Sequence, residues 1–101
     1  GSKADANQYA VALELQADCY AGVWAANASA ASNGKVALEE GDIGEGLRTA
    51  SAIGDDALQR RAGQAVNPDS FTHGSSAQRK EWLLRGYRSG NPNSCDTFSG
   101  L

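Results

Sequence analysis

The stretch that decides the fold is Glu14-Leu15-Gln16-Ala17-Asp18-Cys19, which lies inside a longer Ala-rich segment, residues 6–32, that predicts a single helix. Two residues of this segment are charged, Glu14 and Asp18. Because they are four positions apart, both carboxylates lie on one face of the helix. A partner group can approach this face closely, because its other residues are small: Ala10, Ala17, Ala21 and Ala25.

The larger side chains of the same helix fall on two stripes that lie on nearly opposite sides. A helix that is apolar on two sides is expected to be wedged between partners. At 1.5 Å per residue it would be roughly 40 Å long, whereas a compact domain of this size has a radius of gyration near 13 Å. We therefore expect one stripe to serve a part of the protein outside this chain. The "aromatic stripe" is Tyr9, Leu13, Tyr20 and Trp24, and the "inner stripe" is Val11, Leu15, Cys19 and Gly22.

The spacing of Glu14 and Asp18 allows two interpretations. Like charges at this spacing destabilise a helix by about 0.2–0.5 kcal/mol, and burial of an unpaired carboxylate costs far more. No basic residue lies in the same helix. The carboxylates either face a positive group, such as a metal ion or a metal-bound histidine, or they form a solvated edge of an Ala-rich helix.

Length and charge limit the possible classes of protein. The 101 residues suffice for one domain with a modest core. Gly1-Ser2 is typical of a cloning scar, so the domain is expected to span residues 3–101. Net charge is −3, and the basic residues form no dense run with interleaved aromatics, so nucleic acid is not an expected partner. No apolar run approaches the 18 or so residues of a membrane span.

Caps and helix breakers divide the remainder of the chain. The long helix is expected to begin near Asp5 and to end at Asn33-Gly34. Residues 35–40 predict a turn or a helical start, and residues 66–74 and 91–101 predict loops. No convincing pair of strands is present, so the expected fold class is all-α, with one long helix and about three shorter ones. The expected helices are 6–32, 42–53 (capped by Asp42), 56–64, and 75–89 (a capping box of Ser75 with Gln78, ended by Gly90).

Six acids gather in the middle of the chain, but their spacing lacks the alternating acids, central Gly and terminal Glu of a calcium loop. We predict that they are helix caps and solvated faces: Glu39, Glu40, Asp42, Glu45, Asp55 and Asp56.

Two cysteines and one histidine are the remaining residues with distinctive chemistry. Cys19 and Cys95 either form a disulfide that ties the C-terminal tail to the long helix or remain two unlinked thiols.

His73 lies in a loop flanked by Gly and Ser. It is either a loop histidine bonded to backbone or an imidazole placed to donate to a developing oxyanion.

Four stretches together resemble a bacterial family of neutral zinc metallopeptidases, and the resemblance covers nearly all of residues 9–98. The chain resembles the C-terminal part of such a protein. The stretches are Glu14-Leu15-Gln16-Ala17-Asp18-Cys19-Tyr20-Ala21-Gly22-Val23-Trp24; Gly41-Asp42-Ile43 through Ala52-Ile53-Gly54-Asp55-Asp56; Asp69-Ser70-Phe71-Thr72-His73-Gly74-Ser75-Ser76-Ala77-Gln78-Arg79; and Cys95-Asp96-Thr97-Phe98.

The resemblance implies a peptidase with an HExxH helix and a downstream Glu as the third protein ligand of zinc. Glu14 matches that ligand, and Asp18 matches the Asp that hydrogen-bonds a zinc-ligating His in thermolysin-like enzymes. His73 and Arg79 are similar to the oxyanion-stabilising residues of related zinc peptidases. The family's extracytoplasmic character also favours a Cys19–Cys95 disulfide and an extracytoplasmic or membrane-anchored parent.

HExxH itself is absent from this chain. We therefore expect the two other zinc ligands and the water-activating Glu to lie upstream, in a parent that cleaves a peptide or protein substrate. The 101-residue chain alone is expected to be inactive and to bind no zinc tightly. It is also expected either to hide its surplus apolar surface in a homodimer or to remain sticky. The alternatives are a non-catalytic helical module that binds a protein partner through its exposed stripe, and a purely structural module.

Overall fold

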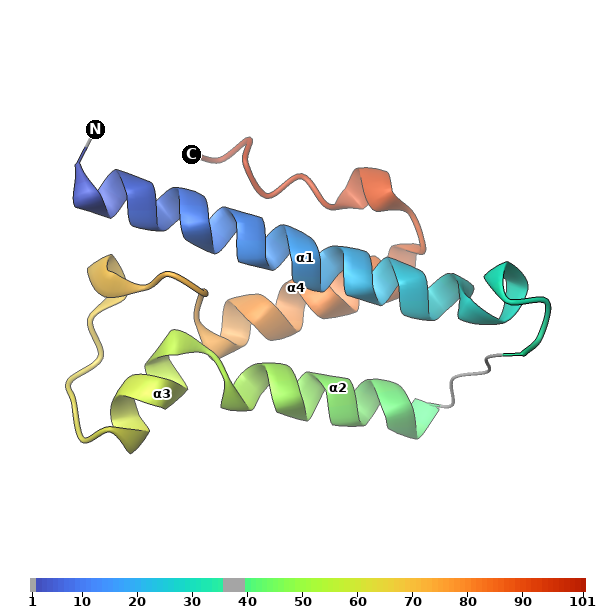
Figure 1. The fold of residues 1–101 in the computed structure, drawn as a ribbon, viewed down its shortest axis with the longest axis horizontal. Coiled ribbons are helices and arrows are strands. Elements are labelled where there is room, and N and C mark those ends of the chain that lie inside the picture. Colours follow the sequence, from blue (N-terminus) through green and yellow to red (C-terminus); the bar gives the residue numbers. More distant parts are fainter. Residues whose placement is uncertain (1, 36–39) are drawn as a thin grey trace.

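The computed structural model describes residues 2–35 and 40–101, and within these residues it contains helices and no strand (Figure 1). The all-α prediction is confirmed. Part of the turn predicted at residues 35–40 lies outside the described residues. The elements are α1 (Lys3–Ala31), α2 (Glu40–Ala52), α3 (Asp55–Arg61), the 3-10 turn η1 (Pro68–Ser70), α4 (Ser76–Ser89) and the 3-10 turn η2 (Pro92–Ser94).

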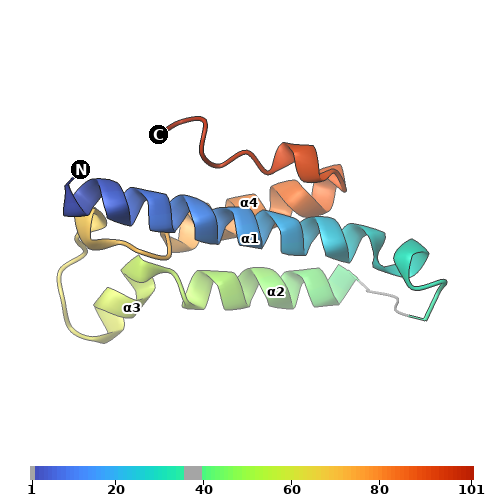
Figure 2. The ribbon, with the colours of Figure 1, turned by 45° about the horizontal axis from the view of Figure 1, so that its top comes forward.

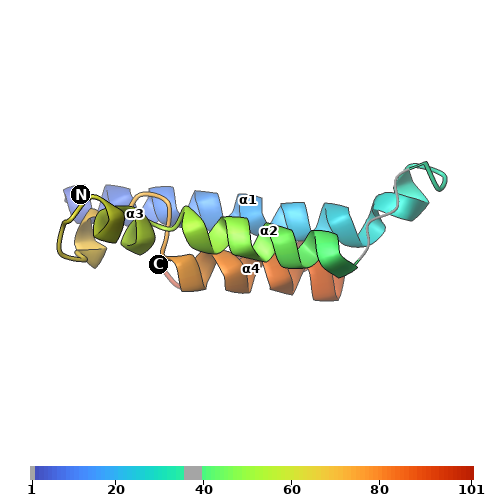
Figure 3. The ribbon, with the colours of Figure 1, turned by 90° about the horizontal axis from the view of Figure 1, so that it is seen from below.

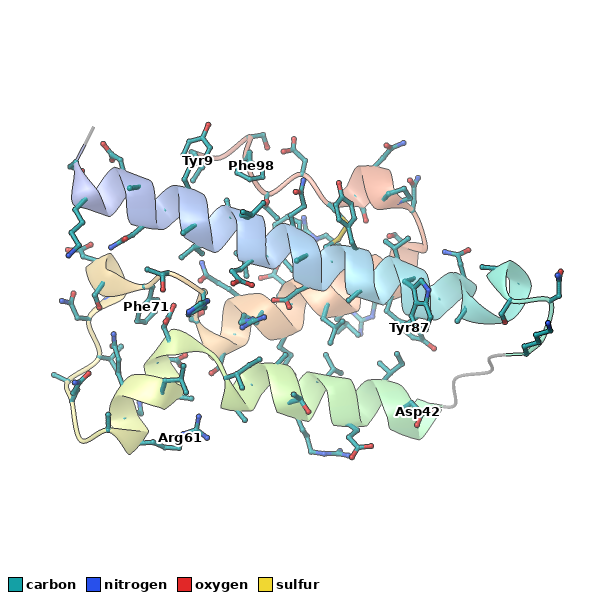
Figure 4. The ribbon with its side chains drawn as sticks, viewed as in Figure 1. Tyr9, Asp42, Arg61, Phe71, Tyr87 and Phe98 are labelled. Atoms are coloured by element: carbon teal, nitrogen blue, oxygen red, sulfur yellow. A yellow bond between two sulfur atoms is a disulfide. The ribbon has the colours of Figure 1, made fainter. Side chains whose placement is uncertain are left out.

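The three long helices lie alongside one another, with α4 running in the same direction as α1 and α2 running in the opposite direction (Figures 1 and 2). α4 packs against α1 along most of its length and also contacts α2. After η2 the tail returns along α1. Cys95 is bonded to Cys19, the Thr97 hydroxyl donates to the Ala12 carbonyl, and the Phe98 ring lies 5.5 Å from the Tyr9 ring (Figure 4).

The helix boundaries follow the predicted caps with small shifts. α1 begins earlier than expected, at Lys3, because Ser2 and Asp5 form a capping box. The predicted capping box of α4, Ser75 with Gln78, is confirmed, and so is its left-handed end at Gly90, where φ is 59°. The prediction that Asp42 caps α2 is wrong, since α2 already begins at Glu40. α3 ends at Arg61, three residues before the predicted end at Gln64.

The contact between α1 and α4 is made by two glycines. A Cβ added to Gly22 would overlap the Leu83 carbonyl oxygen of α4, and a Cβ added to Gly86 would overlap the Cys19 carbonyl oxygen of α1. The two backbones therefore touch directly at this crossing. Any larger side chain at either position requires the helices to separate.

The core is one-sided. The molecule measures 45 × 30 × 16 Å, its radius of gyration is 14.7 Å, and Figure 3 shows how thin it is in one direction. Its 6264 Å² of accessible surface exceeds the roughly 5,400 Å² expected of a folded monomer of 10.5 kDa. Buried apolar residues come from the inner stripe and its surroundings: Ala12, Leu15, Cys19, Ala28, Ala50, Phe71 and Cys95.

The aromatic stripe stays exposed. Its members retain large accessible fractions of their surface: Tyr9 65%, Leu13 61%, Tyr20 46% and Trp24 58%. This exposure agrees with the expectation that one stripe of α1 is left for a part of the protein outside this chain. No helix among the described residues combines the length and the apolarity that a membrane crossing requires.

The glycine contact makes a testable prediction. Gly22→Ala or Gly86→Ala should lower the free energy of unfolding by about 1–3 kcal/mol or more, because each methyl group overlaps a backbone atom. Urea denaturation followed by circular dichroism measures this change. Gly41→Ala in α2 is the matched control, since nothing lies within 4 Å of its Cβ position. It should instead stabilise by about 0.5–1 kcal/mol. Equal stability of the Gly22 and Gly41 variants would contradict the proposed close contact.

The disulfide, now confirmed between Cys19 and Cys95, makes a second prediction. Its sequence separation of 76 residues means that the bond restricts most of the unfolded chain. Reduction should lower the free energy of unfolding by about 3–5 kcal/mol. Denaturation with and without reductant measures the difference, and the intact mass should rise on reduction by one hydrogen atom per sulfur. Detection of two alkylatable thiols in protein purified without reductant would argue against the bond.

Candidate functional site

A largely buried ion pair links α1 and α4 near their glycine crossing. Arg79 Nε donates to Asp18 Oδ2 at 2.8 Å, and Arg79 Nη2 donates to Asp18 Oδ1 at 3.0 Å. The side chains are 12% and 15% exposed. The side-chain hydrogen bonds to Asp18, opposed by desolvation, raise the pKa of Arg79 above its ordinary value, and the charges of Asp18, Glu14 and Asp55 act in the same direction. The solvated-edge interpretation is therefore wrong for Asp18.

Glu14 lies one turn before Asp18 and meets two groups. Its Oε1 lies 3.0 Å from Nδ1 of His73, and its Oε2 lies 3.9 Å from Nη2 of Arg79. The Glu14 side chain is 38% exposed and that of His73 is 49% exposed. The pair is thus open to solvent, whereas the Asp18–Arg79 pair beneath it is not. We call these four residues, Glu14, Asp18, His73 and Arg79, the carboxylate cluster.

The loop that carries His73 is held by Asp55, at the start of α3. One oxygen, Asp55 Oδ2, accepts from the backbone N–H groups of Thr72, His73 and Gly74 at 3.0, 2.7 and 2.9 Å. In return the Asp55 N–H donates to the Gly74 carbonyl at 2.8 Å. Asp55 is 8% exposed and therefore lies on no solvated face, and the N-cap position of α3 belongs to Gly54. No signal in the sequence points to this contact, because the partners lie 17–19 residues away.

The neighbouring Asp56 fixes the start of α4. Its Oδ1 accepts from the Ser76 N–H at 2.7 Å and from the Ser76 hydroxyl at 3.0 Å. Desolvation favours the protonated acid, but the hydrogen bonds from Ser76 and from the N–H groups of Ala57 and Asp56 outweigh it and hold the pKa of Asp56 below its ordinary value. Asp56 is thus a capping residue as predicted, although the helix it caps is α4.

The donor atoms of the carboxylate cluster can be compared with what a metal site requires. A catalytic zinc takes three protein ligands, and the described residues contain no group of three or more His, Cys, Asp or Glu side chains that could hold a metal ion. Glu14 is half-exposed and has a carboxylate of the kind that zinc accepts, so the donor set fits a contribution of one ligand. All four predicted site residues lie together, although Glu14 and His73 are 59 residues apart in sequence. The cysteines are bonded to each other and belong to the core.

Relatives of this chain occur in distantly related bacteria. The uncharacterized protein YpfJ of Escherichia coli K12 is 50% identical over 97 residues, which cover 96% of this chain and 32% of the relative. The uncharacterized proteins Mb2605 of Mycobacterium bovis and Rv2575 of Mycobacterium tuberculosis H37Rv are each 50% identical over 95 residues, covering 88% of this chain and 32% of the relative. The chain therefore spans about a third of the length of the curated relatives it matches. No solved structure matches it.

A comparison with models of protein families gives a match over residues 1–98, which is nearly the whole chain. It includes all four helices and every residue of the carboxylate cluster. The chain therefore belongs to the family described as "Putative neutral zinc metallopeptidase".

Proposed function

We propose that this chain is the C-terminal part of a zinc-dependent peptidase and provides one wall of its active site. Glu14 would be one ligand of the zinc ion, and the upstream part of the protein would supply the HExxH helix with the others. The single observation that carries the proposal is the carboxylate cluster, in which an accessible Glu lies against a largely buried Asp–Arg pair and a loop histidine. When bound, zinc would polarise the substrate carbonyl and activate water.

The chain's own residues have distinct tasks in this proposal. Arg79 holds Asp18 at two points, so the Asp18 carboxylate keeps a fixed orientation from which a remaining lone pair can accept from a zinc-ligating histidine. Arg79 also lies 3.9 Å from Glu14 and offsets the repulsion between the two carboxylates. His73, which is half-exposed, would donate a hydrogen bond to an oxyanion on a peptide substrate.

The upstream part of the protein would cover the aromatic stripe. The stripe lies on α1 beside the accessible Glu14, and the relatives contain about twice as much additional chain as is present here. A disulfide in the core supports an extracytoplasmic or membrane-anchored location for the parent, because such bonds persist in oxidising compartments.

A second candidate function is that of a non-catalytic module that binds a protein partner. The same exposed stripe favours it, since exposed apolar patches of this kind mark interaction surfaces. This alternative gives the Asp18–Arg79 pair a structural task only and requires no zinc.

Substitutions in the full-length protein separate the two functions. Glu14→Gln should abolish zinc binding, because a neutral amide is a poor ligand. Asp18→Asn should weaken zinc affinity or activity by about 10–100-fold. His73→Ala should keep zinc and lower turnover by about 10²–10³-fold. Zinc content by elemental analysis and peptide hydrolysis by purified protein measure these effects.

The matched control is Glu81→Gln, the same chemical change at an exposed position of α4 where the side chain pairs with Arg85. It should leave zinc content and turnover unchanged. If the Glu14→Gln protein binds one equivalent of zinc as tightly as the parent and cleaves peptide normally, Glu14 is not a ligand and the proposed function fails.

The aromatic stripe makes a prediction for the 101-residue chain alone. With no upstream region to cover it, the chain should self-associate or bind a hydrophobic dye. The double variant Leu13→Glu, Trp24→Glu should be monomeric and bind little dye in sedimentation and fluorescence measurements. Leu58→Glu, at an exposed position of α3, is the control and should change neither property. A strictly monomeric parent chain with no dye binding would count against a missing partner for this stripe.

A further inference from the structure

We propose that Asp55 is a positioning residue of the active site, which fixes the His73 loop through its backbone so that the imidazole faces Glu14. The inference rests on the proposed function of His73, and it assigns a role to a residue outside the carboxylate cluster.

Hydrogen bonds in both directions join Asp55 to the His73 loop, and we call this set of bonds the clamp. Three consecutive N–H groups, those of Thr72, His73 and Gly74, converge on the single oxygen Asp55 Oδ2. Such convergence requires an unusual backbone, and Gly74 supplies it with a φ of +91°. The Asp55 N–H donates back to the Gly74 carbonyl, so the loop and the start of α3 are joined in both directions.

The clamp lies between two other fixed points. Phe71, on the preceding side of the loop, is buried, and Ser75, on the following side, is the cap of α4. Between them the orientation of the His73 backbone depends on Asp55. In Asp55→Asn this carboxylate oxygen would be replaced by a neutral amide oxygen, which is a weaker acceptor for three converging N–H groups. The loop would therefore rearrange, and the His73 imidazole would move with it.

The carboxylate also acts on the cluster through its charge. The charge of Asp55 raises the pKa of Arg79, by a smaller amount than the charges of Asp18 and Glu14 do. Asp55 therefore acts on His73 through the backbone and on Arg79 through space. Its neighbour Asp56 bonds Ser76 instead and provides a control with the same residue type in the same helical turn.

The first test measures the loop itself. In the full-length protein, amide hydrogen exchange of residues 72–74 should be slow in the parent and at least tenfold faster in Asp55→Asn. Asp56→Asn should leave these amides protected and expose the Ser76 amide. Equal protection of residues 72–74 in the Asp55→Asn and Asp56→Asn proteins would overturn the clamp, whatever the activity of the enzyme.

The second test connects the clamp to chemistry. Asp55→Asn should retain zinc and KM and lower kcat by about 10–100-fold, as expected when a positioning partner is lost. In a His73→Ala background the same substitution should have no further effect on kcat. An additional loss of tenfold or more in that background, or loss of zinc, would show that Asp55 acts by another route.

A further variant keeps the inference testable if Asp55→Asn does not fold. Gly74→Ala strains the left-handed position and places a methyl group 3.1 Å from Leu15 Cδ2, while Asp55 stays intact. It should reproduce the fall in kcat with zinc retained, and an unchanged kcat with disturbed loop amides would overturn the inference. If His73→Ala alone leaves kcat unchanged, the proposed function of His73 fails, and the hydrogen-exchange result still decides the clamp.

Discussion

The direct backbone contact between Gly22 and Gly86 is the constraint on which the rest of the structure depends. Two helices that touch without intervening side chains have little freedom to slide past each other. A single register of the two helices therefore places Arg79 opposite Asp18. It also brings Arg79 near Glu14, which lies one turn before Asp18 on α1. The same register leaves Cys19 facing Cys95. The ion pair and the covalent bond both depend on how closely α1 and α4 approach.

The helices of the described residues bury one apolar face of α1 and leave another exposed. The inner stripe, the tail and α4 bury the few core side chains, whereas the aromatic stripe is exposed along the middle of α1. The accessible edge of the carboxylate cluster lies between these two faces, with Glu14 and His73 partly open and Asp18 and Arg79 covered. A protein segment that covered the aromatic stripe would therefore lie beside Glu14, which agrees with a site shared between two parts of one polypeptide.

The sequence allowed prediction of the helices and of the shared face of Glu14 and Asp18. It did not allow prediction of the contacts that hold Arg79 and the His73 loop against them. Helical period and caps act within a few residues, so 75–89 could be placed well and Glu14 could be paired with Asp18. The contacts of Asp55 depend on a loop that returns 17–19 residues later, and nothing local distinguishes this acid from Asp56. Nor could spacing reveal that the cation opposite Asp18 is Arg79, which is 61 residues away and on another helix. The resemblance grouped these residues by role, while only the fold shows their contacts.

The Cys19–Cys95 bond has a topological consequence. It closes a covalent ring that contains the C-terminal half of α1, all of α2, α3 and α4, and the exposed stretch at residues 62–67. A peptidase that cut this chain once within the ring would produce two pieces that remain a single molecule until the bond is reduced. α1, which carries Asp18, and α4, which carries Arg79, would then still be connected through the disulfide. A single cut in this ring would therefore leave α1 and α4 in one molecule.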